Sequence, residues 1–328
     1  MPAMPDDGRR IGAHLPLAAG MVRAADRAHE IGATAIAVFA DNPSAWRRRG
    51  EPAAQLAGFR DRLADHGIAP TVIHAAYLAN LAGPDGALFE RSVAVMTAEL
   101  EAAPGYGARY VNAHTGSHRG AGLVAGIERL ADGIARVLEA VDDGPESAML
   151  VLENAAGGGG TIGATVEELA SVAEAIALRG VAEHRVGFCL DSAHAWAAGH
   201  RIDDEAGVER LLDAFDTEIG LARLVLVHLN DSRSAAASHA DRHEHLGAGS
   251  IGEAGLGALL RHPRLGQATF ILETPGMDAG WDAVNIARAR DLLAGRPLTA
   301  LPASAFGLPS GRSRRPDRSV AGGGGAVA

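Results

Sequence analysis

Residues 149–191, MLVLENAAGGGGTIGATVEELASVAEAIALRGVAEHRVGFCLD, decide the fold. Two short apolar runs, Met149–Glu153 and Val186–Asp191, stand on either side of a stretch, Val166–Ala177, whose apolar residues recur at helical spacing. A strand, a helix and a second strand in this order are typical of a βαβ unit with parallel strands.

The same pattern repeats outward in both directions. Six further strands are predicted over Arg10–His14, Thr34–Phe39, Thr71–His74, Arg109–His114, Leu224–His228 and Thr269–Glu273. Further helices are predicted over Met21–Ile31, Gln55–His66, Ala87–Ala102, Leu123–Ala140 and Ala206–Gly220. From Phe39 onward, consecutive strand ends lie about 35 to 45 residues apart, the length that a strand, a loop and a crossover helix need. Eight such units predict an α/β fold, a TIM (β/α)8 barrel.

The domain organisation follows from the same pattern. Barrels of this kind reach 328 residues as one domain, so a single domain is predicted over residues 11–301. Residues 1–10 are predicted to be an N-terminal extension, and residues 302–328, rich in Pro, Gly and Arg, a disordered tail. No hydrophobic leader and no apolar run of about 18 residues is present, so we expect a cytoplasmic monomer without a membrane partner.

Charge and cysteine content exclude several classes of function. The sequence has 30 basic side chains, all Arg, against 40 acidic ones, for a formal net charge of -10. A broad basic surface is therefore excluded, and any nucleic-acid partner must be held locally. The absence of Lys excludes a P-loop and a Lys Schiff base. The single cysteine, Cys189, excludes an intramolecular disulfide and a cluster of thiolate ligands.

Side chains capable of chemistry stand at the ends of the predicted strands. Six strands end on such residues: His74, His114, Glu153, Asp191, His228 and Glu273. The carboxyl ends of the strands form the active face of a TIM barrel, so these side chains should converge. Each one alone has a structural explanation, because a strand-end His is often hydrogen-bonded in the core and a carboxylate often caps the next helix. Several converging buried carboxylates, however, need cations between them, which favours a metal site.

Two further clusters add potential ligands. His194 lies three residues after Asp191, and Asp241 and His243 are alternate residues that share one side of an extended segment. At about four to five ligands per ion, nine candidates predict two or three ions. Imidazole mixed with carboxylate suits zinc or manganese better than magnesium or calcium. Three divalent ions would outweigh four carboxylates and leave positive charge for an anionic substrate such as phosphate.

As an ordered set, these motifs resemble the endonuclease IV family, the family-two apurinic/apyrimidinic endonucleases. The shared motifs are IGAH (11–14), HAAYLANL (74–81), NAHTGSH (112–118), LEN (152–154), CLDSAH (189–194), VHLNDS (227–232), DRH (241–243) and LET (272–274). The resemblance implies a xylose-isomerase-like barrel and zinc-dependent hydrolysis of the phosphodiester 5′ to an abasic site in double-stranded DNA. The implied products are a 3′-hydroxyl and a 5′-deoxyribose phosphate, formed in base excision repair.

The resemblance also implies roles for individual residues. It assigns His74, His114 and Glu153 to one zinc ion, Glu153, Asp191, His228 and Glu273 to a second, and His194, Asp241 and His243 to a third. Glu153 or Glu273 would orient the attacking hydroxide. The expected DNA contacts are Tyr77, Asn42, Trp46 and Arg242.

One loop departs from the family pattern. The family carries a basic or amide side chain between Asn-Pro and Trp, which enters the DNA stack at the lesion. Here the segment is DNPSAW (41–46), and Ser44 and Ala45 are too short for that role. Arg47–Arg49 follow and either substitute for it or form a solvated run of charge.

A glycine run and four histidines outside the ligand set each have two possible roles. Gly157–Gly160 either let a DNA backbone approach closely or are flexible filler. Four histidines outside the ligand set are expected to be structural or to hold ligands in place: His14, His118, His239 and His245.

Two other classes of function remain open. A sugar isomerase or epimerase of the same superfamily also places Glu, Asp, His and Glu at strand ends. The five additional candidates disfavour that class, because an isomerase has no evident need for three ions. A non-catalytic DNA-binding protein on the same scaffold fits the altered loop at Ser44 and Ala45, but the full set of ligand types argues against it.

Overall fold

A closed barrel of eight parallel strands forms the centre of the molecule. The computed structural model describes residues 8–46, 50 and 52–307. The barrel strands are β1 (Arg10–His14), β2 (Ala35–Val38), β3 (Thr71–His74), β4 (Ala108–His114), β5 (Met149–Glu153), β6 (Val186–Asp191), β7 (Leu224–His228) and β10 (Thr269–Leu272). Their order around the barrel is β1-β10-β7-β6-β5-β4-β3-β2. The predicted TIM barrel is confirmed, and every predicted strand end lies within one residue of the observed one.

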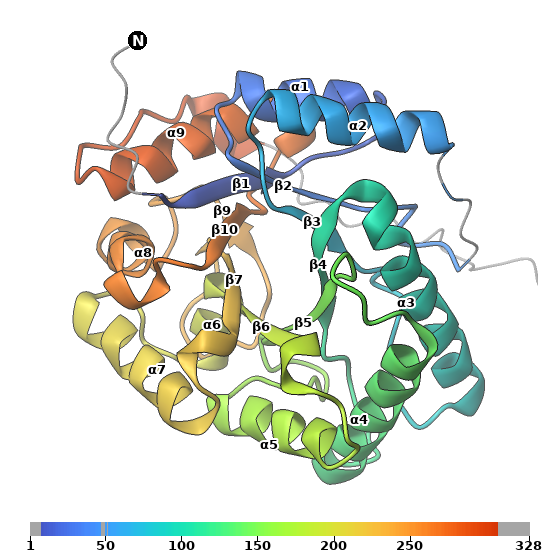
Figure 1. The fold of residues 1–328 in the computed structure, drawn as a ribbon. Helices are drawn as coiled ribbons and strands as arrows, with labels where there is room; N and C mark the ends of the chain where they lie inside the picture. Colours follow the sequence, from blue (N-terminus) through green and yellow to red (C-terminus); the bar gives the residue numbers. More distant parts are fainter. Residues whose placement is uncertain (1–7, 47–49, 51, 308–328) are drawn as a thin grey trace, which may run out of the picture.

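Helices surround the barrel in a ring (Figure 1). They are α1 (Met21–Glu30), α2 (Ala53–Asp65), α3 (Gly86–Tyr106), α4 (Leu123–Ala140), α5 (Val166–Ala177), α7 (Glu205–Glu218), α8 (Gly252–Arg261) and α9 (Asp282–Leu293). The short helix α6 (Ser192–Ala198) follows β6, and strands β8 (Asp231–Ser232) and β9 (His243–Glu244) form an antiparallel pair after β7. Five 3₁₀ turns complete the described elements: Glu183–Arg185, Leu221–Arg223, Pro263–Leu265, Met277–Ala279 and Ala303–Gly307.

Three helices, α6, α8 and α9, are absent from the sequence prediction. Helix α8 carries three glycines, which lower its helix propensity. One of them, Gly255, is required by packing, because a Cβ there would lie 1.9 Å from the Ile202 carbonyl oxygen. Helix α9 buries polar side chains among its core residues, including Asn285 and Arg288, so its apolar pattern is incomplete. Tertiary contacts stabilise both helices where the local pattern is weak.

Side chains alternate along each strand between the barrel interior and the helical shell. A buried cluster made of strand residues alone fills the interior: Ala35, Ala37, Val72, Tyr110, Val151, Cys189, Leu226 and Ile271. The outward residues, such as Ile73, Leu152 and Phe270, belong to the larger core between strands and helices. Because the period is two, the next inward position of β3, β5, β6 and β7 is the last residue of each strand. The apolar interior therefore ends in a layer of His, Glu and Asp.

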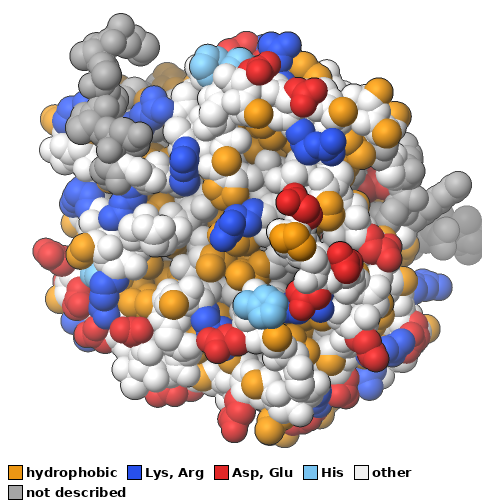
Figure 2. Space-filling model, viewed as in Figure 1, with side chains coloured by type: hydrophobic (Ala, Val, Ile, Leu, Met, Phe, Trp, Pro, Cys, Tyr) orange, Lys and Arg blue, Asp and Glu red, His pale blue; other side chains and the backbone are white. Residues whose placement is uncertain are grey.

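The surface and helices add two observations. On the face drawn in Figure 2, Arg side chains alternate with Asp and Glu and form no continuous basic area. Among the described helices, none is both long and apolar enough to cross a membrane. Residues 1–7 of the expected extension and residues 308–328 of the expected tail lie outside the described part of the chain.

Candidate metal centre

The barrel register brings the predicted ligands together at the carboxyl ends of the strands. His114 on β4 is paired directly with Glu153 on β5, and Asp191 on β6 with His228 on β7. Glu273 immediately follows β10 and completes this side of the barrel. Residues separated by more than a hundred positions in the sequence thus become neighbours because parallel strands end at one edge.

Glu153 lies at the centre of the cluster and is 1% exposed. Its Oε2 atom is 3.7 Å from Nε2 of both His74 and His114. Its Oε1 atom is 3.2 Å from Nδ1 of His228 and 3.3 Å from Nδ1 of His194. One carboxylate therefore contacts four imidazoles.

Eight of the nine candidates, all except Asp241, form three groups that could each hold an ion, with the donor atoms of a group within 4.8 Å of one another. The groups are His74, His114 and Glu153; Asp191, His228 and Glu273; and Asp191, His194 and His243. The first matches one implied set of ligands completely. The second lacks only Glu153, whose Oε1 still contacts His228.

The third group includes Asp191, which the resemblance assigned elsewhere. Asp241 nevertheless belongs to this part of the site, because its Oδ2 is 3.3 Å from His194 Nε2 and its Oδ1 3.1 Å from His243 Nε2. Asp191 also accepts a hydrogen bond from His194 N through Oδ1 at 2.8 Å, capping α6. The geometry of Asp191 therefore fits both roles: it caps helix α6, and its carboxylate lies where it could bind a metal ion.

A further candidate donor, Cys189, was not predicted. It forms a possible group with Glu153 and His228. Burial raises the pKa of the Cys189 thiol to about 12, so the thiol keeps its proton at neutral pH and is a poor ligand there. Its spacing of two from Asp191 could have revealed that it shares the inward face.

Carboxylates and imidazoles shift one another's ionisation in this cluster. Burial alone would lower the pKa of His194, but Asp191, Asp241 and Glu153 together raise it well above its usual value. Burial also opposes protonation of His243, yet Asp191 and Asp241 raise its pKa to about 9. The carboxylates therefore favour cationic neighbours strongly enough to overcome burial.

The same balance holds for the carboxylates themselves. Burial alone would raise the pKa of Glu153, but His228 and His114 hold it well below its usual range. Burial likewise opposes ionisation of Glu273, and His228 and His14 hold its pKa far below normal. Within the described residues, the buried Nε2 atom of His228 has no hydrogen-bond partner, and Nε2 of His243 faces carboxylates only. Buried ionised carboxylates beside imidazole nitrogens are a donor set that fits divalent metal ions.

Several imidazoles are oriented by backbone carbonyls. Nδ1 of His74, His194 and His243 lies 2.8, 2.9 and 2.9 Å from the carbonyl oxygens of Ala75, Asn154 and Glu273, respectively. An Nδ1–H that donates to a carbonyl leaves Nε2 free to bind a metal. These three histidines are thus held ready for coordination through one defined nitrogen.

Amides and one further histidine position the carboxylates, and sequence reasoning did not single out the amides. Asn112 Nδ2 donates to Glu153 Oε2 at 2.6 Å, and Asn230 Nδ2 donates to Asp191 Oδ2 at 2.8 Å. His14, expected to be structural or to hold a ligand, has Nδ1 3.0 Å from Glu273 Oε1. Each Asn lies two residues from a strand-end histidine, in the motifs NAH and HLND. This spacing is the sequence feature that could have predicted their role.

The expected DNA contacts fall into two sets. Tyr77 is 55% exposed and its ring stacks at 5.9 Å on that of His114, and Arg242 is exposed between Asp241 and His243. Asn42 and Trp46 lie in the loop after β2, where Asn42 Oδ1 accepts a hydrogen bond from Ser44 N at 2.9 Å. Arg47–Arg49, the alternative contacts, lie outside the described residues.

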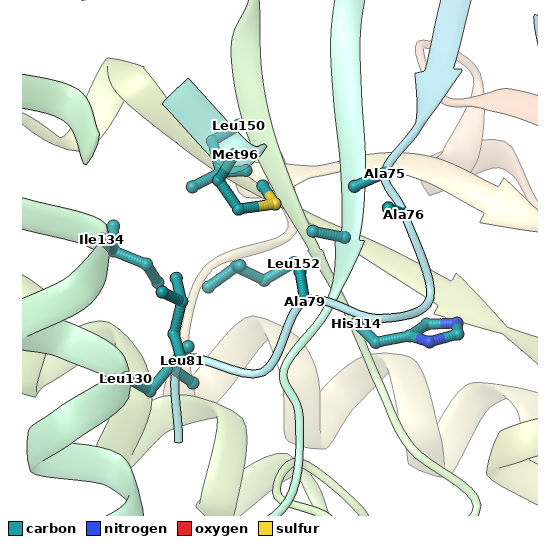
Figure 3. A pocket seen from close by; sticks show the side chains of 11 residues that line it. Ala75, Ala76, Ala79, Leu81, Met96, His114, Leu130, Ile134, Leu150 and Leu152 are labelled. Atoms are coloured by element: carbon teal, nitrogen blue, oxygen red, sulfur yellow. The ribbon is translucent and has the colours of Figure 1, made fainter. Parts of the chain in front are cut away.

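A small cavity separates His114 from the aliphatic core behind it. Its volume is about 20 Å³, enough for one water molecule, and Met96, Leu130, Ile134 and Leu152 are among its lining residues. The His114 imidazole points away from these aliphatic side chains (Figure 3). The ring therefore leaves the aliphatic core, and its Nε2 faces the cluster, 3.7 Å from Glu153 Oε2.

Comparison with known proteins identifies the family. A family model described as xylose isomerase-like TIM barrel matches residues 25–295. A probable endonuclease 4 from Methanoculleus marisnigri is 39% identical over 282 residues, covering 86% of this chain and 98% of that protein. A probable endonuclease 4 from Halothermothrix orenii is also 39% identical, covering 85% and 99%.

Solved structures agree with this result. Endonuclease IV from Thermus thermophilus matches with a TM-score of 0.75 at 39% identity, covering 87% of this chain and 99% of that chain. A D-tagatose 3-epimerase-like protein matches with a TM-score of 0.62 at 17% identity, covering 87% and 96%, which shows the shared barrel alone. This chain belongs to the endonuclease IV family of nuclease enzymes, on a xylose isomerase-like TIM barrel.

Proposed function

We propose that this protein is a zinc-dependent endonuclease that hydrolyses the phosphodiester 5′ to abasic sites in double-stranded DNA, as a step of base excision repair. The observation that carries the proposal is the set of three donor groups at one barrel mouth, two of which share Asp191. Glu153 touches imidazoles of every group. A shared set of this kind suits two or three ions bound close together, the arrangement used to cleave phosphodiesters.

Nine residues would hold three zinc ions, or manganese in their place. They are His74, His114, Glu153, Asp191, His194, His228, Asp241, His243 and Glu273, in the three sets that the resemblance implies. When bound, such ions supply Lewis acidity, lowering the pKa of water and offsetting the negative charge of a phosphodiester.

The chain's own groups orient the reactants around those ions. Glu153 and Glu273 are ionised and hold their positions through Asn112 and His14, so either carboxylate can accept a hydrogen bond from the attacking nucleophile. Tyr77 offers an exposed ring at the edge of the site for the sugar or base. Arg242 supplies a guanidinium for a DNA phosphate.

The altered loop after β2 changes how the lesion is read. Among the described residues of this loop, Ser44 and Ala45 stand in place of longer side chains and are too short to fill the gap left by a missing base. We propose that the chemistry is retained while the discrimination between abasic and intact DNA is weaker than a longer side chain would give. Asn42 and Trp46 would then contact the backbone rather than the gap.

A metal count combined with an incision assay tests the proposal. The protein is stripped with chelator, reconstituted with zinc or manganese, and analysed by mass spectrometry of the metal. A duplex with a tetrahydrofuran abasic analogue, which resists β-elimination, is labelled on the damaged strand. The expected result is about three zinc ions per chain and incision 5′ to the lesion, with a 3′ end that a polymerase extends. One or two ions with sugar epimerisation and no nicking would show that the chain is an epimerase instead.

A further inference from the structure

A groove beside the metal centre extends beyond the candidate ligands. It has a volume of about 300 Å³ and lies against His194, Asp241 and the exposed ring of Tyr77. Its other walls come from the loop after β4 (residues 115–119) and the loop after β5 (residues 154–161). Pockets for small organic groups begin at about this size.

The walls of the groove are tied to one another. Asn80 accepts a hydrogen bond from Ser117 N and donates one to Ser117 O, each at 3.0 Å. Ser117 Oγ donates to Gly159 O at 2.9 Å, and Thr115 Oγ1 donates to Ile162 O. The loops after β3, β4 and β5 therefore form one connected wall whose polar groups are largely satisfied internally.

The glycine run of this wall is explained by two histidines. A Cβ on Gly157 would lie 2.6 Å from His239 Nδ1, and one on Gly160 would lie 3.0 Å from the His118 ring. Both glycines also have positive φ angles, of 86° and 74°. His239 Nδ1 is 3.2 Å from Ala156 O, which attaches the loop after β7 to the same wall. The glycines admit His118 and His239, so the groove is shaped before any substrate arrives.

Within the groove, Thr161, at its buried Oγ1, and Arg119 have side-chain polar atoms without a partner among the described residues. Arg119 is exposed, and its side chain makes no hydrogen bond or ion pair with any described residue. By contrast, Arg233, on the neighbouring loop after β7, is paired with Glu244 at 2.9 Å. Arg119 also adopts a positive φ of 47°, a conformation that is uncommon outside glycine and found at functional positions. On a protein with a net charge of -10, an unpaired guanidinium here offers a local positive charge to an anion.

We propose that this groove receives the nucleotide adjacent to the cleaved phosphodiester, and that Arg119 binds the phosphate on the far side of that nucleotide. The inference rests on the proposed endonuclease function and deepens it. Phosphate contacts of this kind fix the register of the nucleic acid without reading its sequence. Arg119 thus acts in binding and positioning, and its contribution falls on KM more than on kcat.

Salt dependence measures the Arg119 contact directly. Binding of a fluorescein-labelled abasic duplex is followed by anisotropy over a series of salt concentrations for wild type, Arg119→Ala and Arg119→Lys. Arg91→Ala is the matched control, since Arg91 is an exposed arginine on helix α3. Arg119→Ala is expected to lower the slope of log K against log salt by about one, and to raise Kd several-fold. Arg119→Lys should restore the slope, and Arg91→Ala should leave it unchanged.

Neutral methylphosphonates locate the phosphate that Arg119 binds. Each phosphate near the lesion, except the one that is cleaved, is replaced in turn. At one position the methylphosphonate should weaken wild type but cause no further loss in Arg119→Ala, because the contact is already absent. Additive losses at every position, or equal slopes for Arg119→Ala and Arg91→Ala, overturn the inference.

The two proposals fail in distinguishable ways. If wild type incises the duplex but the slope of log K against log salt is the same in wild type and Arg119→Ala, only the groove assignment is overturned. Binding with an Arg119-dependent slope but without incision overturns the endonuclease function and leaves Arg119 as a phosphate contact. Absence of both binding and incision overturns both.

Discussion

Glu153→Gln removes the negative charge that four imidazoles share while keeping the size of the side chain. The first donor group then consists of His74 and His114 alone, because Glu153 is its sole carboxylate. The second group keeps Asp191 and Glu273. We therefore expect the variant to lose one of about three zinc ions and to retain the others.

The size of the effect follows from the burial of Glu153, which is 1% exposed. Removing one partner of a buried charge pair costs about 3 to 5 kcal/mol. At about 1.4 kcal/mol per tenfold change, the affinity for that ion should fall by roughly two to four orders of magnitude. Incision should fall at least as far, since Glu153 is also a candidate to orient the nucleophile.

A chelator-competition titration read by metal mass spectrometry resolves the loss of one ion. Glu99→Gln is the control, because Glu99 is also a buried carboxylate, 3% exposed, and accepts hydrogen bonds from Ala76 N outside the nine candidates. Three zinc ions at wild-type affinity in Glu153→Gln would refute the central position assigned to Glu153. An equal loss of zinc in Glu99→Gln would show that any buried charge change disrupts the site.

Three other predictions concern the same centre. Glu273→Gln should abolish incision while leaving the thermal unfolding temperature within a few degrees of wild type, and incision at the wild-type rate would remove the role assigned to Glu273. His14→Ala removes the side-chain contact to Glu273 Oε1 and should lower kcat or zinc affinity by about 10- to 100-fold, measured by incision and by zinc titration; an unchanged enzyme would make His14 purely structural. In chelator-treated protein, His243 has a folded pKa of about 9 against a usual 6.5, so its stabilisation is complete below pH 6.5 and lost as pH rises through 9. Denaturant unfolding should show that loss, on the order of 3 kcal/mol at most from His243, and constant stability from pH 6.5 to 9.5 would contradict the shift.

The barrel could be predicted from sequence because its determinants are local. Each strand is a short apolar run with a polar end, and each predicted helix has one continuous apolar face. Helix α9 fails this criterion because Asn285 accepts a hydrogen bond from Leu246 N and Arg288 donates to Leu246 O in buried positions. The partners of these polar residues lie on other segments, so no local pattern marks the helix as buried.

The ligand candidates could be predicted for a related reason. In a parallel barrel, the position of a residue within its own strand determines which end of the barrel it occupies. The positions of the strand ends alone therefore predict that His74, Glu153 and Asp191 lie together. The pairing of particular strands, such as that of His114 with Glu153, is not required for this prediction. The groups that orient them, such as Asn230, act across strands, and their roles required the three-dimensional register.

The glycine run shows where local sequence is insufficient. Gly157–Gly160 fit both a close DNA backbone and flexible filler, because composition reveals that space is needed but not what occupies it. The occupants are His118, about forty residues earlier, and His239, about eighty residues later. The close contact is therefore with the protein itself, and it fixes a wall of the groove that Tyr77 also lines. It follows that substitutions such as Gly157→Ala should act on substrate binding through displacement of His239, even though Gly157 need not touch the substrate.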